Sequence, residues 1–234
     1  MTTNETKDLN HFDFSITSYC NAACPSCKRY PDYGHPYVDP NQKLHENLNQ
    51  THMNFDLFEK IINKNIKDFE NKNVTYEGEL GDPLVHPKVE NFIDLGCRIF
   101  KNLRIVTNGG NRRPNFYDKI GNKYKNLQMT FSIDGLHDDT NQIYRKKVNT
   151  QKAIDNMLSF NNSKHGKTFW QFLVFEHNFF EIPEVLEFSK KHKIRTYIKI
   201  NQRPKFEIKK DRLLIVKKMY EKHKTEFSSF MMAN

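Results

Sequence analysis

Short apolar stretches alternate along the chain with longer amphipathic ones. Hydrophobic and β-branched residues predict six strands, at 12–18, 73–80, 103–110, 127–135, 168–178 and 195–201. Between them, apolar residues recur three or four positions apart, which predicts helices over 54–72, 86–100, 115–124, 150–166 and 181–193. The regular order of strand and helix indicates an α/β fold with a parallel sheet and right-handed crossovers.

Six strand–helix units are too few to close an eight-fold barrel. We therefore expect a partial (β/α)6 open TIM-like barrel over residues 1–204, with a flat doubly wound sheet as the alternative. Residues 205–234 predict a basic, amphipathic C-terminal helix that packs on or beside this core, since Leu213, Val216 and Tyr220 follow helical spacing.

The composition limits the classes of protein to which the chain can belong. Its 234 residues carry a net charge of +9, and the lysine-rich stretch 209–224 holds much of the excess. This charge fits either a solvated surface or an anionic partner, so a nucleic acid stays open as a partner. The polar N-terminus and the absence of a long apolar run predict a cytoplasmic protein that does not enter a membrane.

Three of the four cysteines, Cys20, Cys24 and Cys27, follow one another with the spacing C-x3-C-x2-C. In a reducing compartment, such a cluster binds metal more often than it forms disulfides. One interpretation is a [4Fe–4S] cluster whose fourth iron has no cysteine ligand. The other is a zinc ion that takes a histidine such as His35 as its fourth ligand. Cys97 falls on an apolar helical stripe instead and is expected to be a small buried hydrophobe.

Polar and glycine residues follow each predicted strand. They occur in "GELGDPLVHP" (78–87), "TNGG" (107–110), "SIDGL" (132–136), "EHN" (176–178) and "NQR" (201–203). Because functional loops of parallel α/β folds lie at the carboxyl ends of strands, these segments and the cysteine loop predict one site on one rim. Taken singly, "TNGG" and "SIDG" favour ordinary turns, because Asn, Asp and Gly are the residues that turns prefer, and Asp82–Pro83 is likewise a common turn pair. Glu77, Glu79, His177 and Asn178 are candidates for substrate contacts at this rim.

In this order, the cysteine triplet, "GDP", "TNG" and "SIDG" resemble the radical S-adenosylmethionine (SAM) superfamily. The segments "CNAACPSC", "LGDPLVHP" and "FSIDGL" are most similar to the SPASM/twitch branch of this superfamily. The resemblance covers roughly residues 11–201. The resemblance implies a (β/α)6 core in which Cys20, Cys24 and Cys27 bind three irons of a [4Fe–4S] cluster. The amino and carboxylate groups of SAM would then chelate the fourth iron.

Six residues match positions that lie near SAM in that family: Gly81, Asp82, Asn108, Ser132, Asp134 and Arg145. The resemblance implies that the glycine–aspartate pair lines the SAM amino group and that the asparagine lies near the cofactor. It also implies that the serine and the second aspartate, predicted to share one strand face, contact the carboxylate and ribose. The arginine would pair with the same carboxylate through its planar fork.

Two positions depart from the family pattern. Ser26 stands where an aromatic residue usually precedes the third cysteine and packs by the adenine, so Tyr19 or Tyr30 is expected to replace that contact. No cysteine follows Cys97, although relatives in the branch carry a cysteine-rich extension for auxiliary clusters. We therefore expect a single cluster.

The implied activity is reductive cleavage of SAM, with an electron from a flavodoxin or ferredoxin, followed by hydrogen abstraction from a substrate. The sequence assigns no catalytic residue. The resemblance favours a peptide or protein substrate over a nucleic acid or a nucleotide-like metabolite, and a glycyl-radical activase is a further alternative. Outside the family, the alternative is a zinc-binding nucleic-acid adaptor. The long polar segment 31–53 predicts either a lid over the cluster or a disordered connection.

Overall fold

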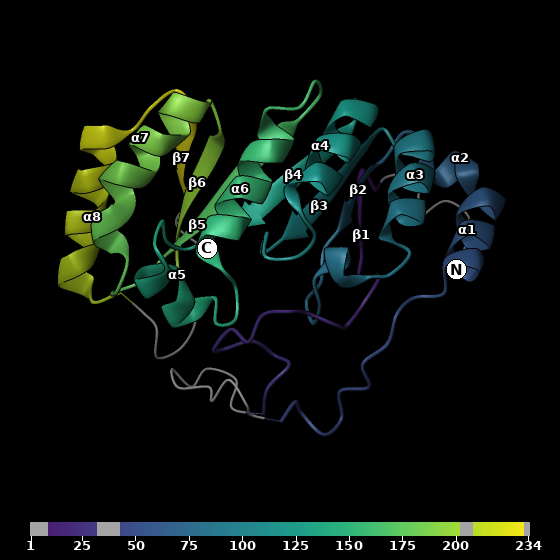
Figure 1. Cartoon of the computed structure of the whole chain (residues 1–234), viewed down its shortest axis with the longest axis horizontal. Coiled ribbons are helices and arrows are strands. Elements are labelled where there is room, and N and C mark those ends of the chain that lie inside the picture. The colour runs from purple at the N-terminus through teal and green to yellow at the C-terminus, as the bar shows by residue number, and fades with distance from the viewer. Residues whose placement is uncertain (1–8, 32–42, 202–207, 232–234) are drawn as a thin grey trace.

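The sheet contains seven parallel strands in sequential order, so each strand pairs with the ones before and after it in the chain. The computed structural model describes residues 9–31, 43–201 and 208–231. Within these ranges the strands are β1 (His11–Phe14), β2 (Asn73–Tyr76), β3 (Asn102–Thr107), β4 (Leu127–Ser132), β5 (Lys167–Val174), β6 (Arg195–Ile200) and β7 (Ser228–Met231). The strands form an arc whose ends do not meet (Figure 1). The predicted open α/β barrel is thus confirmed.

Helices cover the convex side of this arc, and one further helix, α5 (Asp138–Tyr144), lies instead at the carboxyl ends of the strands (Figure 1). The helices on the convex side are α1 (Phe55–Lys64), α2 (Ile66–Phe69), α3 (Val89–Ile99), α4 (Pro114–Lys123), α6 (Thr150–Asn161), α7 (Ile182–His192) and α8 (Lys210–His223). Two 3-10 turns, η1 (Pro83–Val85) and η2 (Phe179–Glu181), follow β2 and β5. In the part of the chain that the structure describes, none of these helices is long and apolar enough to cross a bilayer.

The sheet has one strand more than the sequence predicts. In the C-terminal segment, helix α8 is followed by β7, which pairs with β6 from Thr196↔Ser228 to Lys199↔Met231. Helix α8 buries Val216 and Tyr220 as expected, and the Tyr220 ring lies 5.1 Å from that of Phe230 in β7. The segment therefore forms a further helix–strand unit, which is too short at four strand residues to show alternation.

The two faces of the sheet differ in polarity. In β3, Leu103 and Ile105 are buried against the helices, whereas Arg104 and Val106 on the concave face are partly exposed. The side chains of a closed barrel fill its interior with branched apolar residues. Here the concave face instead carries charged and amide side chains, because the open barrel leaves it accessible to water. This face is therefore a polar groove and not a second core.

Asparagines and a proline set several helix starts. Asn54 caps α1 by accepting from the Leu57 N–H at 2.9 Å, and Asn149 caps α6 by accepting from the Lys152 N–H at 2.7 Å. Pro114 occupies the first turn of α4, where no backbone donor is needed. Helix α7 ends at Lys193 in the left-handed conformation, with φ of 54°. These local signals fix where each crossover turns back toward the next strand.

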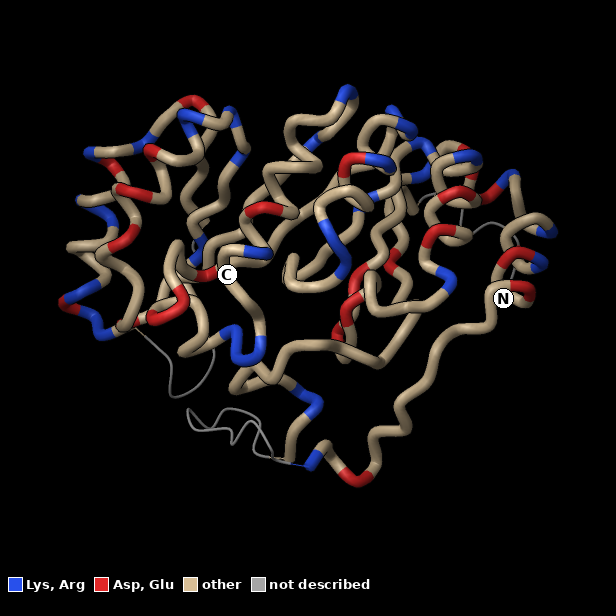
Figure 2. The backbone as a smooth tube through the Cα atoms, viewed as in Figure 1, with Lys and Arg blue, Asp and Glu red and all other residues tan. Residues whose placement is uncertain are grey.

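Basic residues are spread over the outer helices and interspersed with acidic ones (Figure 2). Helix α8 contains four lysines and one arginine together with Asp211 and Glu221. This distribution favours a solvated surface over a single basic patch as the origin of the net charge of +9.

Cys97 lies in α3, away from the other three cysteines in the sequence, and packs against the main core as predicted. Burial raises the pKa of its thiol to about 12. A thiol in such surroundings stays protonated and serves as a small apolar side chain.

Candidate functional site

One cavity of about 600 Å³ opens at the carboxyl ends of the strands. It is bounded by the loop after β1, the loop after β2, the end of β3, the end of β4 and the end of α5. Nine residues are predicted to hold the cluster or SAM, and all of them except Asp134 line this cavity: Cys20, Cys24, Cys27, Gly81, Asp82, Asn108, Ser132 and Arg145. The structure thus brings together residues that are up to 125 positions apart in the chain, from Cys20 to Arg145.

The cysteine loop is held in shape by its own backbone and by one arginine. The Cys27 N–H donates to the Cys24 carbonyl at 3.2 Å, and Ser26 between them adopts a left-handed φ of 58°. The buried guanidinium of Arg29 donates from Nη1 to the carbonyls of Ala22, at 3.2 Å, and Cys20, at 3.5 Å. These bonds curl the loop so that its three thiols face one cavity.

The same loop is tied to its neighbours on both sides. The Ala23 N–H donates to the Lys146 carbonyl after α5, and the Asp82 N–H donates to the Tyr19 carbonyl, at 2.9 and 2.8 Å. Residues 43–53 return along the loop, where the Met53 N–H donates to the Ile16 carbonyl at 2.9 Å. The central part of the predicted lid, residues 32–42, lies outside the described residues, as does His35.

Burial makes the thiols of Cys20 and Cys24 weak acids. Burial raises the pKa of Cys20 to about 12, with further contributions from the Asp82 carboxylate and Cys24. Burial also raises the pKa of Cys24, although the Arg145 guanidinium opposes the shift. Sulfurs that are this poorly solvated ionise readily only when a cation replaces the proton.

Donors already point at two of the sulfurs. Cys20 Sγ accepts from the Ala22 N–H at 3.4 Å and from Asn108 Nδ2 at 3.7 Å, while Arg145 Nη1 lies 3.9 Å from Cys24 Sγ. Hydrogen bonds of this kind stabilise thiolates and tune the potential of a cluster that they bind.

The three thiols line the same cavity. Over residues 9–31, 43–201 and 208–231, no three His, Cys, Asp or Glu side chains are placed to share a single metal ion. Zinc needs each sulfur about 2.3 Å from the same centre. Each thiolate on a [4Fe–4S] cluster binds a different iron, so the cluster does not require the three sulfurs to share one centre.

Asp82 acts mainly through the backbone around it. Its carboxylate accepts from the Leu84 N–H at 3.0 Å, from the Thr107 hydroxyl at 2.9 Å and from the Asn108 N–H at 2.8 Å. Burial raises the pKa of this carboxyl, while these bonds act to lower it. The aspartate therefore joins the loop after β2 to the end of β3 and fixes the backbone of Asn108.

Gly81 packs directly against the cysteine loop. A Cβ atom at this position would lie 2.1 Å from the Thr17 carbonyl oxygen and 2.8 Å from that of Tyr19. Both atoms belong to the backbone, so they can move only if the loop moves. The glycine thus permits the close contact that positions the first cysteine.

We expect Gly81→Ala to displace the cysteine loop and to lower both the free energy of unfolding and the iron content after anaerobic reconstitution. Gly96→Ala in α3 is the matched control, because its Cβ would meet only side-chain atoms of Leu103, Tyr76 and Phe100. This control should lose stability through overpacking, on the order of 1–3 kcal/mol, and still bind iron. Equal iron content in both variants would contradict the assignment.

Arg145 is oriented by a buried acid. Its Nε donates to Asp134 Oδ2 at 2.6 Å, and Asp134 Oδ1 accepts from the Leu173 N–H at 2.8 Å. Burial alone would lower the pKa of the guanidinium, but Asp134 and Cys24 raise it overall, so the arginine stays charged. Strand β4 ends at Ser132, and Asp134 beyond it is fully buried behind Arg145. The predicted shared strand face therefore does not reach Asp134.

Solved structures with a similar fold place this geometry in context, although no protein-family model and no curated protein matches the chain. SuiB from Streptococcus suis, bound to S-adenosylmethionine, is 15% identical with a TM-score of 0.71 over 96% of this chain and 50% of SuiB. The enzyme anSMEcpe with bound AdoMet is 12% identical, with a TM-score of 0.63 over 90% of this chain and 59% of its own. TYW1 with a lysine-pyruvate adduct bound is 14% identical, with a TM-score of 0.56 over 91% of this chain and 73% of TYW1.

The chain has the fold of radical SAM enzymes. This result confirms the fold that the cysteine and strand-end motifs implied, while the SPASM/twitch branch stays a prediction. The chain spans about half the length of SuiB.

The cavity of this radical SAM fold contains an aromatic residue, Tyr144, that the sequence did not predict to be part of the site. Tyr144, at the end of α5, lines the cavity, and the Arg145 guanidinium lies 5.2 Å from its ring centre. Tyr19 stacks on His52 at 4.5 Å, and Tyr30 packs with Ala23; neither lines the cavity. Among the described residues, Tyr144 is thus the aromatic side chain at this site. The stretch "DDTNQIY" is too short and polar to predict its helix.

The four candidates for substrate contacts occupy different environments. Glu77 and Glu79 line the cavity, and Glu79 forms an ion pair with Lys28. Asn178 is fully buried and hydrogen-bonds the backbone of Phe175, Asp134 and Leu173, so its role is to hold the loop after β5. His177 stacks against Phe175, with ring centres 5.1 Å apart.

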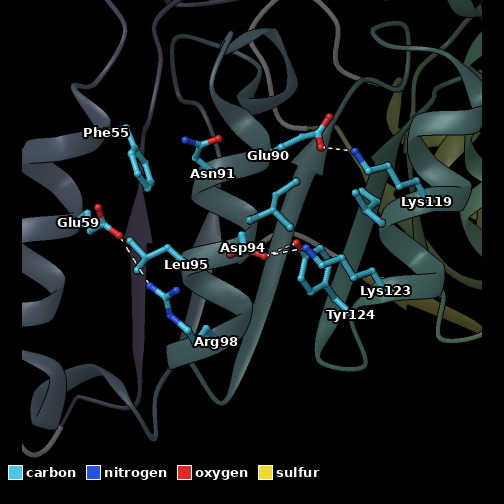
Figure 3. A pocket seen from close by; sticks show the side chains of 12 residues that line it. Phe55, Glu59, Glu90, Asn91, Asp94, Leu95, Arg98, Lys119, Lys123 and Tyr124 are labelled. Atoms are coloured by element: carbon cyan, nitrogen blue, oxygen red, sulfur yellow. Dashed lines mark hydrogen bonds and ion pairs between the residues drawn. The ribbon is translucent and has the colours of Figure 1, made fainter.

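A second hollow, of about 470 Å³, lies between α1, α3 and α4 on the helix layer (Figure 3). Its charged residues pair with one another, as in Lys119–Glu90 at 2.6 Å and Lys123–Asp94 at 2.9 Å (Figure 3). The Tyr124 hydroxyl also donates to Asp94 at 2.8 Å. These exposed pairs satisfy one another and contribute little stability. The hollow is a groove between helices and contains none of the predicted site residues.

Proposed function

We propose that this protein is a radical SAM enzyme that acts on a peptide or protein. In this proposal, Cys20, Cys24 and Cys27 hold one [4Fe–4S] cluster beside bound SAM. The observation that carries the proposal is the single cavity in which the three thiols meet polar residues from the ends of three strands. The fold is shared with SuiB and anSMEcpe, both of which were solved with SAM bound.

Three polar side chains line the cavity together with the thiols, and two of them, Arg145 and Asn108, contact cysteine sulfurs. Arg145 presents a fixed charge for the SAM carboxylate, because Asp134 holds its Nε and leaves other N–H groups for a ligand. Ser132 lines the cavity with a hydroxyl that can donate or accept. Asn108 is buried next to Cys20 and holds the loop through Asn21, with Nδ2 to Oδ1 at 2.9 Å. When bound, the cluster and SAM supply a one-electron route to hydrogen abstraction from an unactivated carbon.

A peptide or protein substrate fits the openness of the barrel. The arc of strands does not close (Figure 1), and partly exposed polar residues such as Arg104 in β3 and Lys199 in β6 alternate with buried ones. SuiB has been solved with its precursor peptide SuiA, and anSMEcpe has been solved with bound peptides. We also infer a cytosolic location, where a flavodoxin or ferredoxin would deliver the electron.

The test of SAM use is cleavage and binding. With dithionite, the anaerobically reconstituted protein should release 5′-deoxyadenosine from SAM, as measured by mass spectrometry. Ser132→Ala should weaken SAM binding by about 1–3 kcal/mol, because it removes a hydrogen bond to a charged ligand. Ser229→Ala, at an exposed position of β7 outside the cavity, is the matched control and should bind SAM normally. Unchanged binding by the Ser132 variant would remove this residue from the SAM site.

A further inference from the structure

Three carboxylates that the cofactor positions do not use also line the cavity: Asp13, Glu77 and Glu79. Asp13 and Ser15 follow one another at period two along β1 and its extension, and Glu77 and Glu79 do the same after β2. All four line the cavity that also contains the three cysteines. Glu77 directly follows β2 and stays beside β1, since its N–H donates to the Phe14 carbonyl at 3.3 Å. Glu77 and Asp13 therefore lie on neighbouring strand ends at this cavity.

The other charged groups of the cavity already have partners. Arg145 pairs with Asp134, Lys28 pairs with Glu79, and three donors satisfy Asp82. Asp13 lies 2.9 Å from His11 Nε2. Among the residues that the structure describes, no hydrogen bond or ion pair reaches the carboxylate of Glu77.

The field at Glu77 favours a positive ligand. Burial raises the pKa of this carboxyl, and the Asp13 carboxylate adds to the shift, as does Glu79. His11 and Lys199 act in the opposite direction but do not cancel it. A cation placed among these carboxylates would relieve their mutual repulsion, which is the electrostatic complementarity that selects a charged partner.

On the basis of the function proposed above, we propose that Glu77 binds the protonated side chain of a lysine or arginine in the peptide substrate. This ion pair would anchor the substrate in the cavity that holds the cysteines. Gln171 on the concave face of β5 lines the same cavity and offers an amide that can both donate to and accept from a peptide backbone. Glu77 is therefore a specificity residue, separate from the groups that hold the cofactors.

The test uses small probes with the reconstituted full chain in the presence of SAM. Binding of Nα-acetyl-lysine amide, Nα-acetyl-arginine amide, the neutral Nα-acetyl-norleucine amide and glycine amide is measured by saturation-transfer NMR. The two cationic side-chain probes should bind more tightly than the neutral probe. Glu77→Gln should weaken their binding on the order of fivefold, as expected for a partly exposed ion pair. Glu187→Gln, at an exposed position of α7, is the matched control and should bind them normally.

Iron content and SAM binding of each variant separate this inference from the proposed function. Normal iron and SAM binding in Glu77→Gln, together with weaker binding of the cationic probes, would support the inference. Equal binding of the neutral probe, or unchanged binding by Glu77→Gln, would overturn it, and equally tight binding of glycine amide would assign the site to an α-amine instead. If the protein takes up no iron but still binds the cationic probes in a way that depends on Glu77, the proposed function is wrong and the cation site is supported.

Discussion

Asp134→Ala is expected to lower the free energy of unfolding by about 3–5 kcal/mol, since it leaves a buried arginine without its counter-ion. Asp134 is fully buried, and the side chain of Arg145 is only 13% exposed. The aspartate also accepts a hydrogen bond from the Leu173 N–H, so its removal leaves this second buried donor without an acceptor. The measurement is urea unfolding followed by circular dichroism, with the wild type in parallel.

An exposed ion pair provides the control for this prediction. Glu90→Ala breaks the pair with Lys119, whose side chains are 51% and 60% exposed. This variant should lose less than about 1 kcal/mol. If Asp134→Ala costs no more than Glu90→Ala, the carboxylate does not orient Arg145 in the way that the structure indicates.

Cys24→Ala should abolish cleavage of SAM. Cys24 is one of three thiols that line the cavity, and each would be the ligand of a different iron in the proposed cluster. Loss of one ligand should therefore prevent stable assembly, lower the iron content and leave no detectable 5′-deoxyadenosine after dithionite. Mass spectrometry of the nucleoside product and iron analysis on the same sample measure both effects.

Cys97→Ala is the matched control for the cysteine variant. Cys97 packs against the core from α3 and does not line the cavity. The control should retain iron and activity and lose only packing energy. Equal loss of iron in both variants would mean that the effect comes from stability and not from ligation.

The sequence predicted most of the fold because hydrophobic periodicity is strong in its long elements. Strand β5 contains Trp170 and Phe172, both buried against the helices, and its limits differ from the prediction mainly at the C-terminal end. Predicted strands ran too far there because buried apolar residues continue past the last strand residue, as Ile133 does after β4 and Phe175 after β5. Helix α5 and strand β7 were missed because they are short and carry little apolar periodicity.

The sequence predicted which residues form the site, but it did not predict how they contact one another. Spacing and order placed the cysteines and Gly81 on one rim, and the family resemblance added Arg145; the structure finds all of them in one cavity. Sequence could not show that Asp134 turns away from the cavity to hold Arg145, because that depends on where β4 ends. Tyr144 entered the site through a helix that no pattern predicted.

The most direct test of the central claim is the amount of iron and acid-labile sulfide bound per chain after anaerobic reconstitution. A [4Fe–4S] cluster on Cys20, Cys24 and Cys27 predicts brown protein with about four irons and four sulfides per chain, and a visible absorbance that dithionite bleaches. Colourless protein that holds one zinc and no sulfide would contradict the cluster and the activity proposed with it.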